Sequence, residues 1–418
     1  MKVLLLTQHY YPCIGGVETY VRQMAQEFAK AHQVSVAAVN FAPCQIPDRI
    51  GVLHTSLLAP SYASHWDRSV YVHALTPTLL DRFKMLPIVL RATPRLQRYA
   101  YEPLSQFGYR YYYSSYANKL RTLMQGVDIV HCHAVDYLGW AAQAVAQELG
   151  IQFVCTPYVH PHECGDDVAN VEYQKRAQAV IALTSINQKY LLSLGIQASK
   201  LHIIGVAPDL APTVDAESFR QEHNLQNVPI VLYIGRMVPY KGAKALLDAR
   251  ELVWKIAPET RFVFIGPMTK ESSIWFETTD HRVLYLGRVS QQQKANALAA
   301  CDIFCMPSLS EILPTVYVEA WNYAKPVIAG LAEGLSELVA GNHAGTNVSQ
   351  EVEEIGAAIN QLLLDPELRE RYGRNGKKLV EEHYTVQKIT QEHIHLYNNL
   401  LTESKKAVQG KDLSEHRF

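Results

Sequence analysis

The chain has 418 residues, of which 48% are hydrophobic and 19% are charged. That length is about twice the usual size of one domain, so we expect two domains with separate cores. The formal net charge is −1, so the overall balance does not indicate a nucleic-acid backbone or an acidic polymer as partner.

The sequence does not show the pattern of a secretory signal. The first apolar run, Val3–Leu6, is only four residues long, and no run approaches the ~20 apolar residues that a membrane-spanning helix needs. The seven cysteines are an odd number without a disulfide-like spacing, which suits a reducing compartment. We therefore expect a cytoplasmic protein that is soluble or lies on the inner face of a membrane.

Short β-rich runs alternate with helical patterns along both halves of the chain. This alternation predicts the α/β class, with parallel sheets covered by helices on both faces. Helices are expected at Gly16–Ala31 and Gly242–Ile256. Strands are expected at Lys2–Thr7, Val34–Val39, Asp128–Cys132, Gln152–Cys155, Ala179–Leu183, Lys200–Ile204, Ile230–Ile234, Phe262–Ile265, Val283–Leu286, Ile303–Met306 and Pro326–Ala329.

The segment Gly205–Gln226, rich in Pro, Ala, Asp and Asn, separates the two halves. We place the domain boundary near Asp209. This gives a first domain over residues 1–209, a second over 210–385, and a C-terminal helix with a loose tail over 386–418.

One segment, residues 81–121, breaks the alternation because it is dense in Arg and Tyr. It reads either as a helical insertion with a solvated basic face, or as a segment that lies at a lipid headgroup layer or lines a polar acceptor cleft. Its aromatic members include Tyr99, Tyr101, Tyr109, Tyr111, Tyr112, Tyr113 and Tyr116.

Loops that follow strands are the expected place for ligands in open α/β sheets. After the first strand, Gly15 and Gly16 stand directly before a helix, where glycines let a phosphate approach the backbone N–H groups. A tight turn needs such a pair equally well. The loop is not a GxGxxG motif, and the second strand ends at Asn40 rather than at an acid, which disfavours a dinucleotide site.

The motif GRMVPYKG bridges a strand and a helix in the second half and carries Arg236 and Lys241. Two cations that converge at the mouth of a cleft suit a diphosphate, whose developing charge they would neutralise as a sugar bond breaks. Solvated surface cations are the alternative.

The motif EILPTVYVE places Glu311 and Glu319 at the entry to a helix. If the stretch is mostly helical, eight residues at ~1.5 Å each separate them by ~12 Å. That is wider than the ~5 Å carboxylate pair of a retaining hydrolase, but it suits hydrogen bonds to the hydroxyls at both ends of a sugar donor. Ordinary helix-surface charges are the alternative.

Two histidines, His131 and His133, end a strand in the motif HCH. Because side chains alternate along a strand, we expect only one of them to point toward the crevice. Gly334–Glu337 starts another helix after a strand, or forms a simple capping turn. A crowded stretch could be drawn as metal ligands but reads better as a loop, so we expect no bound metal; it contains His160, His162, Cys164, Asp166 and Asp167.

Taken together, these motifs resemble glycosyltransferase family 4 (group 1), a large family of retaining enzymes with the GT-B fold. The resemblance is strongest over Val231–Val339, and its most specific part is Asp302–Ala329, with a Pro-Ser loop, two glutamates, a Glu-Ala helix and a Lys-Pro-Val-Ile strand. It implies two Rossmann-like domains that face each other across a cleft, an acceptor-side domain (1–209) and a nucleotide-sugar-binding domain (210–385).

The resemblance also implies roles in the second domain. Arg236 and Lys241 would hold the donor diphosphate and stabilise the leaving group, Glu319 would bind the ribose hydroxyls, and Glu311 would bind a hydroxyl of the transferred sugar. Thr315, at the entry to the same helix, is expected to contact the donor as well.

In the first domain, Gly15 and Gly16 would approach the donor phosphate, and His133 would lie near the reacting centre between donor and acceptor. Gly334 and Glu337 match a further part of the family's cleft.

The activity that this resemblance implies is transfer of a hexosyl unit from a nucleotide-diphosphate sugar to a glycan or lipid-linked acceptor, with retention at the anomeric carbon. No cofactor or metal ion is expected, nor is a nucleic-acid partner. UDP, GDP and ADP sugars are not distinguished by these motifs, since they read the shared diphosphate and ribose. The expected pathway is the synthesis of a surface polysaccharide or a glycolipid.

Some positions depart from the family pattern. Ile312 stands where many relatives have Gly, the segment between the domains reads GVAPD over Gly205–Asp209, and Glu333 precedes Gly334 where many members have two glycines. Ile312 motivates an alternative hypothesis, a catalytically impaired scaffold that binds a nucleotide sugar or glycan. A phosphorylase or a sugar-nucleotide epimerase is disfavoured, because neither a pyridoxal site nor a matching base pattern is evident.

Overall fold

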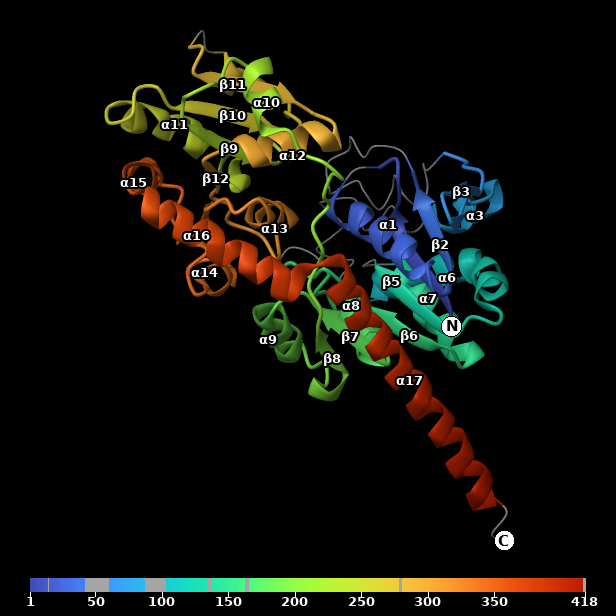
Figure 1. Ribbon diagram of the computed structural model, residues 1–418. Helices are drawn as coiled ribbons and strands as arrows, with labels where there is room; N and C mark the ends of the chain where they lie inside the picture. Colours follow the sequence, from blue (N-terminus) through green and yellow to red (C-terminus); the bar gives the residue numbers. More distant parts are fainter. Residues whose placement is uncertain are drawn as a thin grey trace. The chain divides into compact units, whose positions relative to one another are not determined.

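The computed structural model describes residues 1–13, 15–41, 60–86, 103–133, 137–161, 165–277 and 280–415. The chain forms two compact units (Figure 1), one made of Met1–Gly205 with Val386–Phe418 and the other of Val206–Thr385. The first division falls between Gly205 and Val206, close to the boundary that the sequence places near Asp209. The second division falls between Thr385 and Val386, so the C-terminal helix belongs to the first unit.

The first unit is built on one sheet in the order β3-β4-β2-β1-β5-β6-β7-β8, in which only β3 and β4 pair antiparallel. The strand order reverses between β1 and β5, which makes that position the switch point where open α/β sheets bind ligands. The strands are β1 (Lys2–His9), β2 (Gln33–Asn40), β3 (His65–Asp67), β4 (Val70–Ala74), β5 (Ile129–His133), β6 (Gln152–Cys155), β7 (Ala179–Ala182) and β8 (Leu201–Ile203).

Helices cover both faces of this sheet. On one face, Leu4 and Leu6 of β1 belong to a core that includes Tyr116 of α6 and Ala142 of α7. The helices of the unit are α1 (Gly16–Phe28), α3 (Leu79–Lys84), α6 (Pro103–Met124), α7 (Tyr137–Leu149), α8 (Val168–Arg176), α9 (Ser185–Ser193), the 3₁₀ turn Ala198–Lys200 and α17 (Val386–Glu415).

The opposite face is covered by α1 and α17. Helix α1 buries Val21, Met24 and Phe28, which recur at the spacing of one helix face. The ring of Phe28 contacts His393 of α17 edge-on, with 6.0 Å between centroids. Helix α17 is continuous to Glu415 through the polar segment for which the sequence predicts a loose tail.

The second unit has a six-stranded parallel sheet in the order β11-β10-β9-β12-β13-β14. Strand β9, with the sequence IVLYI, is buried along its whole length, as expected for a parallel strand covered on both faces. The strands are β9 (Ile230–Ile234), β10 (Arg261–Ile265), β11 (Val283–Gly287), β12 (Ile303–Met306), β13 (Val327–Ala329) and β14 (Gly345–Asn347).

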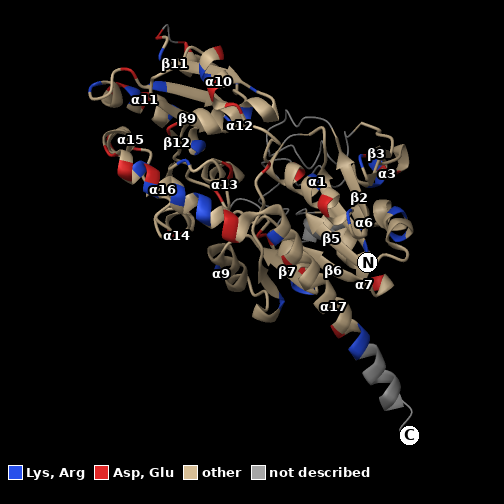
Figure 2. Cartoon of the chain, in the orientation of Figure 1, with Lys and Arg blue, Asp and Glu red and all other residues tan. Residues whose placement is uncertain are grey.

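The helices of the second unit pack closely at small residues. A Cβ atom on Gly376 of α16 would lie 2.1 Å from Trp321 Cδ1 of α13, so glycine is what lets these helices meet. Lys, Arg, Asp and Glu alternate along α16 (Figure 2). The helices are α10 (Ala216–Glu222), α11 (Ala243–Trp254), α12 (Gln291–Ala300), α13 (Thr315–Asn322), α14 (Leu335–Leu338), α15 (Val352–Leu364) and α16 (Pro366–Leu379), with 3₁₀ turns at Pro239–Lys241 and Ser273–Phe276 and a π-turn at Val380–Tyr384.

The prediction of an α/β fold with two parallel sheets is confirmed. The expected strands are present within one or two residues at each end, whereas β3, β4 and β14 are absent from the sequence-based prediction. Within residues 81–121, the described part contributes to α3 and α6, and Tyr112 and Tyr116 point into the core rather than to a headgroup layer. Tyr99, Tyr101 and the side chain of Tyr109 lie outside the described part of the chain.

Candidate functional site

The candidate residues of the second unit gather on loops at one edge of its sheet. Strands β9, β12 and β13 are neighbours and run parallel, so their carboxyl ends meet at the same edge. The loop after β9 carries Arg236 and Lys241, the loop after β12 carries Glu311, and the loop after β13 carries Gly334. The topology therefore places four sequence-predicted residues at the edge where such sheets bind ligands.

Lys241 and Glu311 form an ion pair between Lys241 Nζ and Glu311 Oε1. The Lys241 side chain is 18% exposed and the Glu311 side chain 9% exposed. The pair is therefore partly shielded from solvent, and the attraction between its charges is less screened than in an exposed pair. Lys241 ends a 3₁₀ turn closed by Gly242, whose φ is +82°. A Cβ atom at Gly242 would lie 2.6 Å from the carbonyl oxygen of Pro307, so glycine allows the two loops to touch.

Tyr240 lies between the two cations. Arg236 Nη2 donates a hydrogen bond of 2.6 Å to the Tyr240 hydroxyl. The Arg236 guanidinium carbon is 6.0 Å from the centroid of the Tyr240 ring, and Lys241 Nζ is 5.4 Å from it. The ring thus holds both cations to one region of the edge. Sequence analysis missed Tyr240, although its place beside Lys241 in the GRMVPYKG motif was the available signal.

Glu319 lies on α13, whereas Glu311 lies in the loop before it. The helix begins at Thr315, with Pro314 as N-cap, because the residue before a proline avoids the helical region. The helical spacing of ~12 Å that the sequence suggests for the two glutamates therefore does not apply. Thr315 is half-buried at the first position of α13.

The Glu319 side chain is almost fully buried. Lys294 Nζ of α12 lies 2.8 Å from Glu319 Oε1, while Oε2 is buried and makes no hydrogen bond of standard geometry with the described part of the chain. Burial raises the pKa of Glu319, and the charge of Lys294 opposes that rise. A buried carboxylate oxygen of this kind is an acceptor that a ligand hydroxyl can satisfy.

The last motif of the second unit is the turn into α14. Gly334 has a φ of +88° and stands directly before the helix, and Glu337 is exposed on it. Because these positions follow β13, they share the edge with Lys241 and Glu311.

In the first unit, Gly15 has an extended backbone and Gly16 begins α1. A Cβ atom on Gly15 would lie 2.2 Å from Glu18 Oε2, so the missing side chain makes room for the Glu18 carboxylate. Burial raises the pKa of Glu18, and a hydrogen bond to its own backbone opposes the rise. A phosphate approaching these glycines would meet this carboxylate, a residue that sequence analysis missed.

The prediction that strand alternation lets only one of His131 and His133 point toward the crevice rests on a wrong premise, because the two side chains share one face of the sheet. Their ring centroids lie 3.9 Å apart, and both side chains are buried on the face covered by α1 and α17. Residues two apart on a strand share a face, because the side-chain period is two. Only Cys132, between them, points to the other face and into its core.

Tyrosine and threonine hydroxyls hold these histidines. The Tyr397 hydroxyl is 2.6 Å from His131 Nδ1 and the Thr156 hydroxyl is 2.8 Å from His131 Nε2. The Tyr158 hydroxyl is 3.0 Å from His133 Nδ1. Tyr158 has a φ of +48°, a conformation that non-glycine residues rarely adopt.

A third histidine, His393 of α17, completes a buried cluster. Its ring centroid is 5.6 Å from that of His131, and its Nδ1 donates to the carbonyl oxygen of Ile389 at 2.8 Å. Nε2 of His133 and Nε2 of His393 are buried without a partner among the described residues. Burial lowers the pKa of His133 to about 3 and that of His393 to about 4, and it lowers that of His131 as well.

Potential metal ligands meet at one place among the described residues. The ligand atoms of His9, Cys13 and Glu18 lie within 4.8 Å of one another. In the crowded stretch seen in the sequence, the Tyr190 hydroxyl donates to Asp166 and Asn170 donates to Asp167, as expected for a structured loop. His162 and Cys164 lie outside the described residues.

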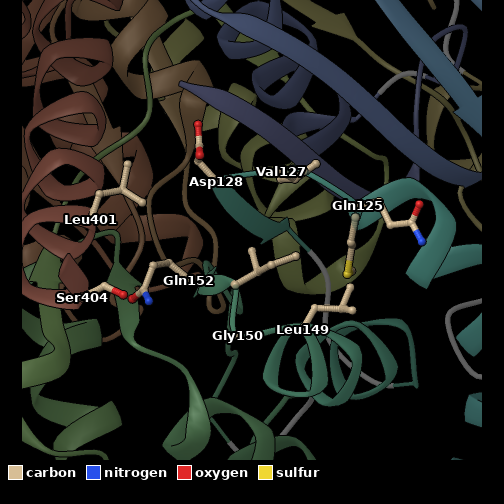
Figure 3. A pocket seen from close by; sticks show the side chains of 11 residues that line it. Gln125, Val127, Asp128, Leu149, Gly150, Gln152, Leu401 and Ser404 are labelled. Carbon is tan, nitrogen blue, oxygen red and sulfur yellow. The ribbon is translucent and has the colours of Figure 1, made fainter. Parts of the chain in front are cut away.

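A pocket in the first unit lies at the opposite end of the sheet. Figure 3 shows pocket residues at the starts of β5 and β6, among them Asp128 just before β5 and Gln152 at the first position of β6, together with Leu401 of α17. These positions are at the amino ends of the strands, and His133 is at the carboxyl end of β5. The pocket is therefore not part of the candidate site.

Two family models match the chain, one in each half. The model described as Glycosyltransferase Family 4 matches residues 14–211, and the model described as Glycosyl transferases group 1 matches residues 215–379. Among solved structures, HepE of Anabaena in complex with UDP has a TM-score of 0.71 at 19% identity and covers 96% of this chain and 100% of its own. The sucrose-phosphate synthase of Thermosynechococcus elongatus has a TM-score of 0.68 at 19% identity, with coverage of 96% and 99%.

Two curated relatives are mannosyltransferases by name. The GDP-mannose-dependent monoacylated alpha-(1-6)-phosphatidylinositol monomannoside mannosyltransferase of Corynebacterium glutamicum is 32% identical over 38% of this chain, a stretch that spans only 44% of the relative's own length. The GDP-mannose-dependent alpha-(1-6)-phosphatidylinositol monomannoside mannosyltransferase of Mycolicibacterium smegmatis is 25% identical over 90% of this chain and 92% of its own.

The solved structures identify the two-unit architecture as the GT-B fold of glycosyltransferases. The chain belongs to glycosyltransferase family 4, group 1. Within the described ranges, no helix combines the length and the apolar character needed to cross a membrane.

Proposed function

We propose that the protein is a hexosyltransferase that uses a nucleotide-diphosphate sugar and retains the configuration of the anomeric carbon without a metal ion or cofactor. The observation that carries this proposal is the Lys241–Glu311 pair with Arg236 and Tyr240 at the carboxyl edge of the second sheet. This edge offers two cations for a diphosphate and carboxylates for sugar hydroxyls. Membership of the family supports the same reaction.

In this proposal Arg236 and Lys241 bind the diphosphate oxygens of the donor. As the bond between the sugar C1 and the diphosphate oxygen breaks, negative charge grows on the leaving group, and the fixed cations stabilise it. The acceptor hydroxyl oxygen bonds to C1 on the same face, and its proton passes to the departing phosphate oxygen. The charges that assist the reaction thus come from the chain itself.

In this proposal Glu311 both pairs with Lys241 and binds the transferred sugar. Its partner Lys241 holds the carboxylate in place before the donor binds, and one of its oxygens then accepts a hydrogen bond from a hydroxyl of the transferred sugar. Glu319 accepts hydrogen bonds from the ribose through its buried carboxylate. Thr315, Gly334 and Glu337 contact the donor from neighbouring positions at the same edge.

The first unit supplies His133 near the reacting atoms and the Gly15–Gly16 turn near the phosphate. His133 stays neutral at physiological pH because burial lowers its pKa to about 3, so it acts as a hydrogen-bonding group rather than as a cation. We place the acceptor, a glycan or a lipid-linked sugar, with this unit and the reaction at the cytoplasmic face of a membrane. No nucleic-acid partner is involved.

The alternative, an impaired scaffold that binds a nucleotide sugar or glycan, rests on Ile312. This residue is half-buried beside Glu311, and it leaves the Lys241–Glu311 pair in place. The relatives named as transferases favour turnover.

The stereochemistry and the metal requirement are tested together. The protein is incubated with an α-linked nucleotide sugar and acceptor sugars in the presence of EDTA, and the anomeric configuration of the product is read by NMR. We expect an α-linked product at a rate that EDTA does not change. A β-linked product, or a reaction abolished by EDTA and restored by a divalent cation, would overturn these parts of the proposal.

Replacing Glu319 by Gln should weaken donor binding by about tenfold or more, because a charged hydrogen-bond acceptor at a buried site is lost. Donor Kd is measured by calorimetry, and the melting temperature checks that the loss of the Lys294 partner leaves the fold intact. Glu353→Gln, an exposed change on α15, is the matched control. An unchanged donor Kd in Glu319→Gln would remove the ribose role from this residue.

A further inference from the structure

Helix α3 of the first unit is fixed to the protein by its polar side. The Thr78 side chain accepts a hydrogen bond from the backbone of Asp81, and the Asp81 carboxylate accepts one from the backbone of Thr78, which closes a capping box. Lys119 Nζ of α6 lies 2.7 Å from Asp81 Oδ2 and also donates to the carbonyl oxygen of Thr76. Asp81 and Met85 are buried, so this side faces the protein.

The other side of α3 is apolar and faces solvent. Leu79 is 78% exposed, Leu80 64%, Phe83 71% and Leu86 52%. Positions 79, 83 and 86 follow the spacing of one helix face, so these side chains form one patch, the α3 patch. A surface helix normally buries its apolar side, and an exposed group of this kind marks an interaction site.

The charges around the α3 patch are positive. Lys84 is exposed and Arg82 half-exposed on the same helix, whereas its only acid, Asp81, is buried in the ion pair with Lys119. Leucine and phenylalanine at the centre with lysine and arginine at the margin is the composition of elements that lie in the headgroup layer of anionic membranes.

A stable protein interface fits this surface less well. Such an interface buries ~800 Å² on each partner, which three side chains on a helix of six residues and one just after its end do not provide. Three tyrosines of α6 do not extend the surface, because Tyr112 and Tyr116 are in the core and Tyr113 bonds to Glu148.

We propose that the α3 patch docks the protein on an anionic bilayer, with Leu79, Leu80, Phe83 and Leu86 entering the headgroup layer. The proposal rests on the proposed function in one respect, since a lipid-linked acceptor would be met at that surface. It differs from the sequence-based hypothesis for residues 81–121, because apolar insertion at α3 provides the attachment and the basic residues provide the preference for anionic lipid.

The test uses the full chain and sedimentation with vesicles of phosphatidylcholine, with and without phosphatidylglycerol. We expect binding that requires phosphatidylglycerol, and a loss on the order of tenfold or more when Leu79, Leu80 and Phe83 are all replaced by Ser. Lys84→Glu should lower binding and weaken its dependence on the anionic lipid. Leu364→Ser and Ile274→Ser, which alter side chains 67% and 66% exposed in the second unit, are the controls and should bind normally.

Several outcomes would overturn the docking proposal. The first two are absence of vesicle binding by the wild type and normal binding by the triple variant. The third is a lower melting temperature of the triple variant, which would mean that the chain itself covers the patch. The fourth is a wild-type dimer that the triple substitution dissociates. Donor hydrolysis in the absence of vesicles reports separately on the proposed function. It should be equal in the wild type and the triple variant.

Discussion

Replacing Lys241 by Ala should lower kcat by about 10²-fold or more. Lys241 is one of two cations at the edge of the second sheet, and its Nζ is already held by Glu311 and beside the Tyr240 ring before the donor binds. Preorganised groups of this kind stabilise developing charge without moving, and losing one typically costs two to three orders of magnitude. Arg236→Ala should act in the same direction, because Arg236 shares Tyr240 with Lys241.

The control is Lys244→Ala, in the first turn of α11, three residues after Lys241. Lys244 pairs with Asp248 on the surface, so its loss removes a similar charge at little cost in stability. Because Lys241→Ala leaves Glu311 without its partner, melting temperatures of all variants are compared first, and Lys241→Ala combined with Glu311→Gln removes the uncompensated charge. Rates like those of the wild type in both Lys241→Ala and Arg236→Ala would refute the diphosphate role of these residues.

Acidification from pH 6.5 to about 4.5 should destabilise the first unit by several kcal/mol. His131, His133 and His393 are buried and their pKa values are lowered, to about 3 for His133 and about 4 for His393. The unfolded chain, with histidine pKa near 6.5, binds more protons in this window, so stability is full above pH 6.5 and falls as the pH falls. His133 and His393 each contribute on the order of 2–3 kcal/mol at pH 4.5, and His131 acts in the same direction, against a total of ~5–15 kcal/mol for a domain.

The groups that face this cluster are mainly hydroxyls. Tyr20 of α1, Tyr397 of α17 and Tyr158 contact the histidine rings, and Glu18 lies near Tyr158. Among the described residues, the hydrogen bonds of the three rings go to hydroxyls and to the carbonyl oxygen of Ile389, so protonation would leave buried positive charge without a paired carboxylate.

Thermal unfolding between pH 7.5 and 4.5, followed by circular dichroism, measures this effect. His393→Phe keeps an aromatic ring beside Phe28 and should flatten the pH dependence by about one proton. His395→Gln, on the exposed side of α17, should leave it unchanged. A melting temperature that stays constant over this range in the wild type would show that the cluster is not buried as described.

The fold could be predicted from the sequence wherever strands are continuous apolar runs. Strands such as β9 and β12 are buried along their length, and a parallel sheet with two covered faces requires that pattern. Strands β3 and β14 have three residues each and mixed polarity, so no periodicity identifies them. They form because their neighbours in the sheet provide an edge to pair with.

The candidate site was predictable only in part. Lys241 and Glu311 are 70 positions apart, and the family resemblance, rather than any local pattern, named them together. Tyr240 and Glu18 were missed because neither position is unusual. A tyrosine in a turn and a glutamate in the first turn of a helix are both common without a ligand. The error on His131 and His133 came from applying strand alternation to residues that share a face.

A thermal-shift and nucleotide-release screen against UDP-, GDP- and ADP-sugars, without added metal, tests the central claim most directly. The account predicts that one nucleotide class raises the melting temperature and is slowly hydrolysed, and that Lys241→Ala loses both responses while Lys244→Ala keeps them. Stabilisation without release, even with acceptors present, would favour the binding scaffold. No response to any donor would contradict the assignment of Arg236, Lys241, Glu311 and Glu319 to a nucleotide-sugar site.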